Sequence, residues 1–289
     1  MGQAAHSPAL RRRREELEAL YAACNRHALI PPDPLELLYR HEDPADREIA
    51  GLVAALLAYG GVKQIVASGA DALARMGRSP ARFVREASPA EMASAFRGFK
   101  HRWTRGRDVA ALLAGVQGAI RRHGSLERSF VAGMGVDDET VLPALAAWVA
   151  LLRRGGGRSG RDLLSCPGKG SACKRLNLFL RWMVRKDEVD PGLWTRVPAS
   201  KLVVPLDVHM HRIARALGLT RRKQADLKAA LEVTEAFRAI RPEDPVRYDF
   251  VLTRAAMRGF SVRCSGFSER RKSPARTSLP EHRTLRAET

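Results

Sequence analysis

An aspartate stands between an apolar run and the start of a predicted helix in the stretch KLVVPLDVHMHRIARALGL, residues 201–219. The carboxylate of this residue, Asp207, can accept hydrogen bonds from the first backbone N–H groups of the helix and so act as its N-cap. A reaction that needs a rigidly held carboxylate could use the same side chain, because capping fixes its orientation. The two roles are compatible, so the position of Asp207 alone does not separate them.

A glycine-rich turn precedes this aspartate in the chain. It has the sequence Pro-Gly-Lys-Gly, residues 167–170, it follows two apolar residues, Leu163 and Leu164, and we expect a helix to begin directly behind it. Glycine lets the backbone approach a phosphate closely, and the N–H groups and positive dipole end of the helix would bind that phosphate. An ordinary tight turn between two helices is the alternative interpretation. The predicted DNA-backbone contacts here are Gly168, Lys169, Gly170, Ser171 and Arg175.

The helix predicted after the turn has an apolar face and a basic face. The apolar residues expected in the core are Ala172, Leu176, Phe179, Leu180 and Met183. Lys174, Asn177, Arg181 and Arg185 follow one another at i, i+3, i+7 and i+11, which places them on a different face. We expect that face to contact DNA, with Arg181 as a phosphate ligand and Lys174 as either a nucleophilic amine or one more phosphate contact.

The charge of the chain favours a polyanionic partner. Lys and Arg number 50 against 31 Asp and Glu, which gives a formal net charge of +19. Residues 151–186 hold ten Lys or Arg and one acid, a net charge of +9. The alternative is compositional, since 41 of the 50 basic residues are Arg, as a GC-rich genome would produce. The concentration of basic residues in 151–186 is therefore stronger evidence for a polyanionic partner than the total net charge is.

The sequence argues against a membrane-spanning protein, a secreted protein and a metal site. No apolar run approaches the ~20 residues that span a bilayer, and the N-terminus lacks the apolar core of a signal peptide, so a cytoplasmic location is expected. The four cysteines, at positions 24, 166, 173 and 264, lack zinc-site or cluster spacing. His209 and His211 point to nearly opposite sides of a helix and cannot share an ion. We therefore expect no metal and no cofactor.

The periodic segments predict an all-α fold. Apolar residues recur at helical spacing in 46–61, 108–124, 138–157 and 243–259, with Asp108 and Asp244 as expected N-caps. The best strand candidate, residues 201–206, is too short to require a sheet. We divide the chain into an N-terminal basic helix and linker (1–33), a main domain (34–264) and a disordered basic tail (265–289).

The combination of hairpin, lysine and capped helix resembles the helix–hairpin–helix DNA glycosylases of the endonuclease III type. The matching pieces are CPGKG, Lys174 and the LDVH segment of residues 206–209. The segment IAGLVAALLAYGGVKQI is similar to the early helix and following loop of that family. Together with HRW, GSACKRLNLFLRWMVRKDEVD and DPVRYDFVLTR, these segments look like an uncharacterised bacterial branch of the superfamily, over roughly residues 34–262.

This resemblance implies a two-lobed helical bundle with a helix–hairpin–helix motif at about 163–186 and a cleft between the lobes. Asp207 would lie in the cleft, stabilise an oxocarbenium-like sugar and help to activate the nucleophile. Lys174 would attack C1′ and form a Schiff base, which adds lyase activity. Lys63 and Gln64 would fill the gap left by a flipped base. Trp182, Tyr248 and His209 are the weaker candidates for the base pocket.

The chain departs from the family pattern at three points. Lys169 replaces the apolar residue that usually lies between the hairpin glycines, and Lys174 comes four residues after Gly170. The separation of 33 positions from Lys174 to Asp207 exceeds the usual spacing. An archaeal 8-oxoguanine glycosylase branch has a comparably long gap. The clustered cysteines of the iron–sulfur members are absent from the sequence.

The sequence therefore favours a DNA base-excision repair glycosylase, with or without lyase activity, that acts as a monomer on double-stranded DNA carrying a damaged base. Its expected location is the cytoplasm, in association with the nucleoid. One alternative is a non-catalytic DNA-binding protein that keeps the glycosylase fold. A more distant one is an RNA-binding or structural helical protein whose charge reflects genome composition.

Overall fold

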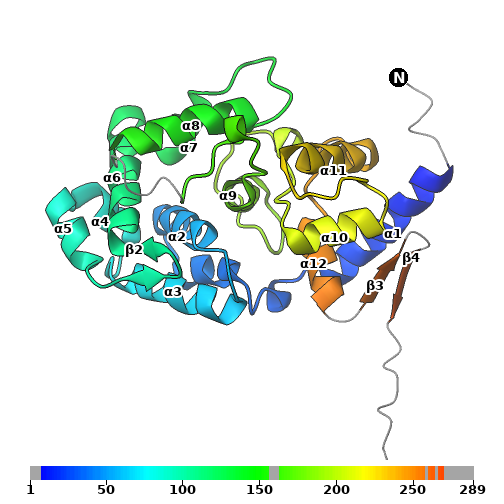
Figure 1. Ribbon diagram of the computed structural model, residues 1–289, viewed down its shortest axis with the longest axis horizontal. Coiled ribbons are helices and arrows are strands. Elements are labelled where there is room, and N and C mark those ends of the chain that lie inside the picture. Colours follow the sequence, from blue (N-terminus) through cyan, green and yellow to red (C-terminus); the bar gives the residue numbers. More distant parts are fainter. Residues whose placement is uncertain (1–7, 156–162, 258–259, 264–265, 270–289) are drawn as a thin grey trace, which may run out of the picture.

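The computed structural model describes residues 8–155, 163–257, 260–263 and 266–269, and most of these residues are helical (Figure 1). The elements in chain order are α1 (Pro8–Cys24), η2 (His27–Leu29), η3 (Pro34–Arg40), α2 (Pro44–Leu56), α3 (Val62–Ala74), α4 (Pro80–Glu86), α5 (Pro89–Ala95), β1 (Lys100–His101), β2 (Thr104–Arg105), α6 (Gly106–His123), α7 (Leu126–Val131), α8 (Leu142–Gly155), η4 (Pro167–Lys169), α9 (Lys174–Val184), η5 (Ala199–Lys201), α10 (Val208–Ala216), α11 (Leu227–Ile240), α12 (Asp249–Met257), β3 (Phe260–Arg263) and β4 (Gly266–Glu269). Every helix in the described ranges is too short or too polar to cross a bilayer.

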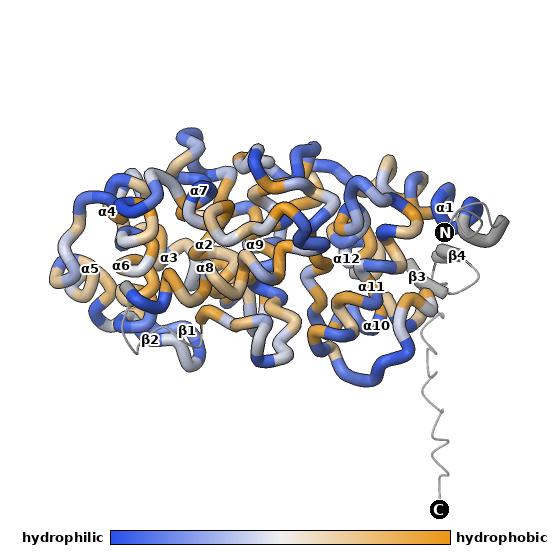
Figure 2. Tube along the Cα trace, turned by 90° about the horizontal axis from the view of Figure 1, so that it is seen from above, coloured by the Kyte–Doolittle hydropathy of each residue, from blue (hydrophilic) through white to orange (hydrophobic). Residues whose placement is uncertain are grey.

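Helix α9 lies near the middle of the molecule. Figure 1 shows α2 to α8 on one side of it and α10, α11, α12 and α1 on the other. The predicted apolar face of α9 is confirmed, since all five of its residues are buried. Hydrophobic residues are concentrated along α2, α8 and α9, where the two sides meet (Figure 2).

Two glycines let the helices of the first group pack closely. A Cβ atom on Gly51 of α2 would lie 3.0 Å from both Leu38 of η3 and Met183 of α9. A Cβ atom on Gly115 of α6 would lie 2.0 Å from the carbonyl oxygen of Leu152 in α8, which is too short for any real contact. Any larger residue at position 115 would therefore push α6 and α8 apart.

The predicted helices are present, but two of their starts differ from expectation. Asp108 is not the N-cap of α6; it lies inside the first turn, and its carboxylate accepts a hydrogen bond from the backbone N–H of Arg105. Asp244 does not cap α12, which begins at Asp249 instead. The carboxylate of Asp244 accepts from the guanidinium of Arg185 at 2.9 Å, so the expected cap is used in a tertiary ion pair.

Two short antiparallel hairpins accompany the helices. Strands β1 and β2 pair Lys100 with Arg105, and strands β3 and β4 pair Phe260 with Glu269. The strand candidate, residues 201–206, forms no strand: Lys201 ends η5, and residues 202–206 form no regular element. Strand β4 lies in the range predicted to be a tail without structure, and residues 270–289 of that range lie outside the described residues, as does Cys264.

The prediction that α9 exposes a basic face along its length is wrong, because Arg181 and Arg185, at the end of the helix, are buried. Arg181 and Arg185 are each only 4% exposed. Arg181 pairs with Asp190 and Asp249, and Arg185 pairs with Asp190, Asp244 and Asp187. A buried charge is tolerated only where such partners satisfy it. Arg181 is therefore not available to a DNA phosphate.

Helix α1 covers one edge of this charge network. The hydroxyl of Tyr21 donates to Asp187 at 2.7 Å. The carboxylate of Glu18 accepts from the hydroxyl of Tyr248 at 2.7 Å and from the guanidinium of Arg247 at 3.1 Å. The N-terminal helix is thus joined to the residues that precede α12 and to the loop after α9.

We expect Arg185→Met to lower the free energy of unfolding by about 3–5 kcal/mol, because it leaves Asp190, Asp244 and Asp187 without a shared buried cation. Urea unfolding followed by circular dichroism would measure the loss. The matched control is Arg82→Ala, which breaks an exposed i,i+4 pair with Glu86 and should leave the free energy of unfolding nearly unchanged. A similar small change for both variants would contradict the structural role of the network.

Candidate functional site

A cavity of about 550 Å³ opens where the end of α2, the start of α10 and the helices α9 and α12 meet. Its ionisable lining includes Lys174 from α9, Asp207 before α10 and Asp249 from α12. The structure thus brings together the two predicted catalytic residues, Lys174 and Asp207, and adds the carboxylate of Asp249. The volume lies within the range typical of small-molecule sites.

Asp207 is the N-cap of α10, as predicted. One oxygen of its half-buried carboxylate accepts a hydrogen bond from the backbone N–H of Met210 at 2.7 Å. The apolar residues before it, 202–206, are buried and anchor the approach to the helix. The hydrogen bond from Met210 and the buried segment 202–206 together hold the carboxylate of Asp207 at the wall of the cavity.

Asp249 was missed by the sequence analysis. It lies in the first turn of α12, is 5% exposed and accepts a hydrogen bond from Arg181. Burial raises the pKa of the Asp249 carboxyl to about 6; Arg181 opposes this shift, and the negative charge of Asp207 adds to it. No local signal marked Asp249, because Asp244 followed by Pro245 is the better cap pattern.

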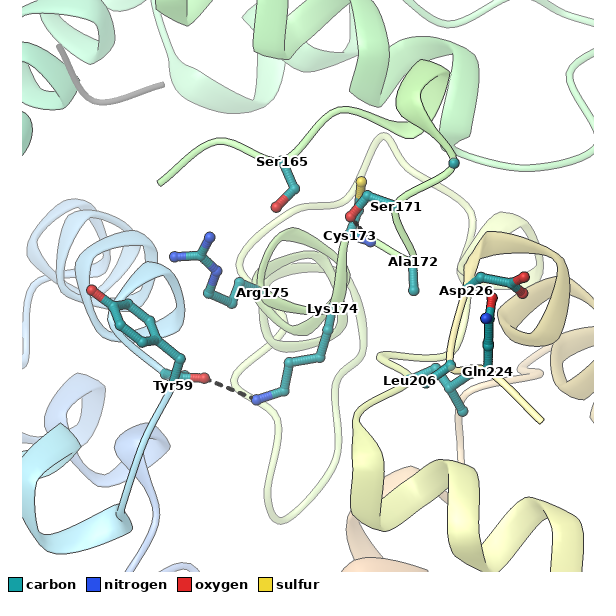
Figure 3. Close-up of a pocket in the computed structure, with 13 residues that line it drawn as sticks. Tyr59, Ser165, Ser171, Ala172, Cys173, Lys174, Arg175, Leu206, Gln224 and Asp226 are labelled. Carbon is teal, nitrogen blue, oxygen red and sulfur yellow. Dashed lines mark hydrogen bonds between the residues drawn. The ribbon is translucent and has the colours of Figure 1, made fainter. Parts of the chain in front are cut away.

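Lys174 is the first residue of α9, and its Nζ donates to the carbonyl oxygen of Ala58 at 3.1 Å (Figure 3). The next residue, Arg175, donates to the carbonyl oxygen of Leu56 at 2.8 Å and lies over the ring of Tyr59. Both cations therefore interact with carbonyl groups at the C-terminal end of α2, which is the negative end of that helix dipole.

The glycine-rich turn is exposed but is not followed at once by a helix. Gly168, Lys169 and Gly170 are exposed, and α9 begins four residues after Gly170. Cys173 precedes the helix with a φ of +47°, a left-handed conformation that reverses the chain direction. Residues 156–162, between α8 and the turn, lie outside the described residues.

A second cavity of about 480 Å³ lies beside the turn and shares Ala58, Tyr59 and Lys174 with the first. Figure 3 shows Ser165, Ser171 and Arg175 on one side of it, and Gln224 and Asp226 on the other. Lys174 is therefore accessible from both cavities. The hydroxyl of Ser171 accepts from the backbone N–H of Cys173 at 3.2 Å.

The other predicted site residues lie apart from the cavities or play different roles. Trp182 and Tyr248 are fully buried in the core and line neither cavity, so their assignment to a base pocket is wrong. His209 is exposed and lines the first cavity. Lys63 and Gln64 are exposed, but they form the first turn of α3 rather than a loop, and Gln64 donates to Ser68 at 2.9 Å.

His211 is a structural residue, with its Nε2 at 3.0 Å from the carbonyl oxygen of Arg222. In the described part of the chain, no group of three or more His, Cys, Asp or Glu side chains is arranged to hold a metal ion. Cys24, Cys166 and Cys173 are free thiols.

Comparison with known proteins gives one family match. The model of the family described as "Protein of unknown function (DUF2400)" matches residues 33–258, which include Lys174, Asp207 and Asp249 of the first cavity. No curated protein and no solved structure matches the chain.

The capping role of Asp207 can be measured separately from chemistry. Asn caps helices about as well as Asp, whereas Ala loses the cap. We expect Asp207→Asn to leave the free energy of unfolding nearly unchanged, and Asp207→Ala to lower it by about 1 kcal/mol. Chemical denaturation of the two variants beside the wild type is the measurement; equal stability of all three would show that the Met210 contact adds nothing.

Proposed function

We propose that this chain, which belongs to the DUF2400 family, is a DNA glycosylase that cleaves the N-glycosidic bond of a damaged base. The observation that carries the proposal is the cavity of about 550 Å³ in which a lysine and two aspartates meet from three separate elements. Acids that can transfer protons and an amine that can act as a nucleophile are groups that glycosidic cleavage can use.

In this proposal the two groups of helices on either side of α9 act as two lobes, and the first cavity is the cleft between them. Residues 163–186 act as the helix–hairpin–helix motif. The exposed Gly168, Lys169 and Gly170 would bind the DNA backbone, which positions the protein without reading sequence. The target base would rotate out of the duplex and enter the cavity.

Asp207 would stabilise the positive charge that develops on the sugar as the base leaves. One of its oxygens is held by the N–H of Met210, so the carboxylate needs no reorganisation during the reaction. In the hydrolytic route a water oxygen bonds to C1′ while its proton passes to Asp207. The C1′–N bond breaks, and its electron pair leaves with the base, which takes up a proton.

Lys174 fits two roles. As a nucleophile it would give up its hydrogen bond to Ala58, pass a proton to Asp207 and bond to C1′ as the C1′–N bond to the base breaks. Opening of the C1′–O4′ bond would then give a Schiff base, which permits strand cleavage. As a phosphate contact it would keep its charge and bind the DNA beside the exposed turn. Its position between the two cavities is compatible with both.

Asp249 is the candidate source of the proton for the departing base. It lines the cavity and, with a pKa raised to about 6 by burial, can be protonated in mildly acidic solution.

The alternative is a DNA-binding protein that retains the fold without the chemistry. It is favoured by the contacts of Lys174 and Arg175 with the end of α2, which give both cations a structural use. The ion pair with Arg181 gives Asp249 a structural use as well, but a purely binding protein gives no role to the raised pKa of its carboxyl at the cavity wall.

We expect Asp207→Asn to lower base release by about 100-fold or more while the melting temperature is retained. The test is incubation with duplexes that carry 8-oxoguanine, uracil, oxidised pyrimidines, alkylated purines or abasic sites, with borohydride to trap a Schiff base. Lys174→Arg keeps the charge and the hydrogen-bond donor but cannot form a Schiff base.

An adduct in the wild type that Lys174→Arg abolishes would identify Lys174 as the nucleophile. Base release without an adduct would mean that water attacks. Absence of both on every lesion, with salt-sensitive DNA binding retained, would favour the non-catalytic alternative.

The pH dependence tests the role of Asp249. Its folded-state pKa is raised to about 6 from an ordinary value near 3.8, so the protonated form is populated below pH 6 and lost above it. Base release by the wild type should therefore fall as pH rises through about 6. Asp249→Asn should be slow at pH 5 and nearly flat between pH 5 and 8, in single-turnover assays on the lesion found by trapping. A variant that keeps the wild-type profile would exclude Asp249 as the proton donor.

A further inference from the structure

An exposed tryptophan lies at the tip of the hairpin formed by β1 and β2. Trp103 is 58% exposed, whereas the other three tryptophans of the chain, Trp148, Trp182 and Trp194, are at most 3% exposed. A large aromatic ring in solvent loses the burial energy that its neighbours in the core obtain. Tryptophan is enriched at binding interfaces, which makes this exposed ring a candidate contact surface.

The ring is held against the rim of the cavities. Trp103 stacks on Tyr59 with 4.6 Å between ring centroids and 20° between planes. Tyr59 lines both cavities, and its hydroxyl donates to the side chain of Thr104 at 2.6 Å. His101 fixes the same hairpin from the other strand, with its Nε2 at 3.1 Å from the carbonyl oxygen of Tyr59. The position of the indole is thus set by the residues that form the site.

The preceding residue adopts a strained conformation. Arg102 has a φ of +52°, which is uncommon for a non-glycine residue, and its guanidinium carbon lies 5.0 Å from the centre of the Trp103 ring. Gly60 accommodates this arrangement, because a Cβ atom there would lie 3.0 Å from the side chain of Arg102. Strain of this kind persists where surrounding contacts enforce it, and it clusters at binding sites.

The hairpin is also a basic surface. The segment RGFKHRWTRGR, residues 97–107, contains five Lys or Arg and no acid. All five are exposed: Arg97, Lys100, Arg102, Arg105 and Arg107. The segment 151–186 differs, because two of its arginines, Arg181 and Arg185, are buried in ion pairs.

We infer that Trp103 stacks on a nucleobase of a DNA strand that is bound next to the cavities, while Arg102 and the neighbouring cations hold its phosphates. An aromatic face that is flanked by cations is the usual platform for an unpaired base. The inference rests on the proposed function only in that DNA is the ligand, and it does not require base excision. It assigns to this hairpin the contact with the strand outside the catalytic cavity.

Tryptophan fluorescence gives a direct test, because Trp103 is the exposed member of the four. Titration of the wild type with single-stranded oligonucleotide, and with duplex containing an unpaired base, should quench the emission as the indole stacks on a base. Trp103→Phe should remove that quenching. Trp103→Ala should weaken binding of the same oligonucleotides by about 5- to 100-fold.

The matched control is Arg122→Ala. Arg122 is an exposed cation near the C-terminal end of α6, about 25 Å along that helix from β2. The Arg122→Ala substitution removes one charge and leaves the hairpin unchanged. The affinity of this variant for the same oligonucleotides should therefore fall by less than about 3-fold. Melting temperatures of all variants should match the wild type, since Trp103 is largely exposed.

The outcomes separate this inference from the proposed function. DNA binding without quenching, with an affinity that Trp103→Ala leaves unchanged, would overturn the stacking inference alone. Failure of the wild type to bind any DNA would overturn both. Equal quenching by heparin, a polyanion without bases, would show that Trp103 senses charge and would also overturn base stacking.

Discussion

The buried pairing of Arg181 and Arg185 with Asp190 is the constraint on which the rest of the structure depends. Asp190 is fully buried and accepts from both guanidinium groups, and each arginine reaches at least one further carboxylate. Withdrawing these charges from water costs several kcal/mol per ion, and only complete mutual satisfaction offsets that cost. The second half of α9 is therefore fixed relative to the loop that follows it and to the first turn of α12. Through Arg181, the same interaction fixes Asp249 at the wall of the first cavity.

The opposite end of α9 is anchored by a different kind of interaction. Lys174 and Arg175 donate to carbonyl oxygens at the end of α2, where the helix leaves such groups without internal partners. One helix is thus tied by hydrogen bonds to the first group of helices and by ion pairs to the second. Helix α9 thus sets the positions of Lys174 and, through Arg181, of Asp249, whereas Asp207 is held separately by the start of its own helix.

Features that depend on neighbouring residues follow from the sequence, whereas features that depend on a contact with a residue far along the chain do not. The helices containing residues 46–56 and 108–123, the apolar face of α9 and the Asp207 cap all follow from spacing and capping chemistry. The exposure of Arg181 was mispredicted because its partner Asp249 lies 68 residues away. The start of α12 was mispredicted for the same reason, since Arg185 uses Asp244, 59 residues away. Asp249 could be recognised as a site residue only once both errors were corrected. The glycosylase activity and the DNA contacts stay predictions.

Helix α1 lies before the range that the family model matches, yet it contacts the charge network through Tyr21, and Glu18 joins it to Tyr248. A helix in this position excludes water and so lowers the local dielectric constant. The attraction between opposite charges becomes stronger as a result. Opening of α1 would admit water to Asp187 and weaken the attraction that Arg185 exerts on its carboxylates. Helix α1, which lines neither cavity, thus affects the ion pairs at the centre of the molecule by keeping water away from them.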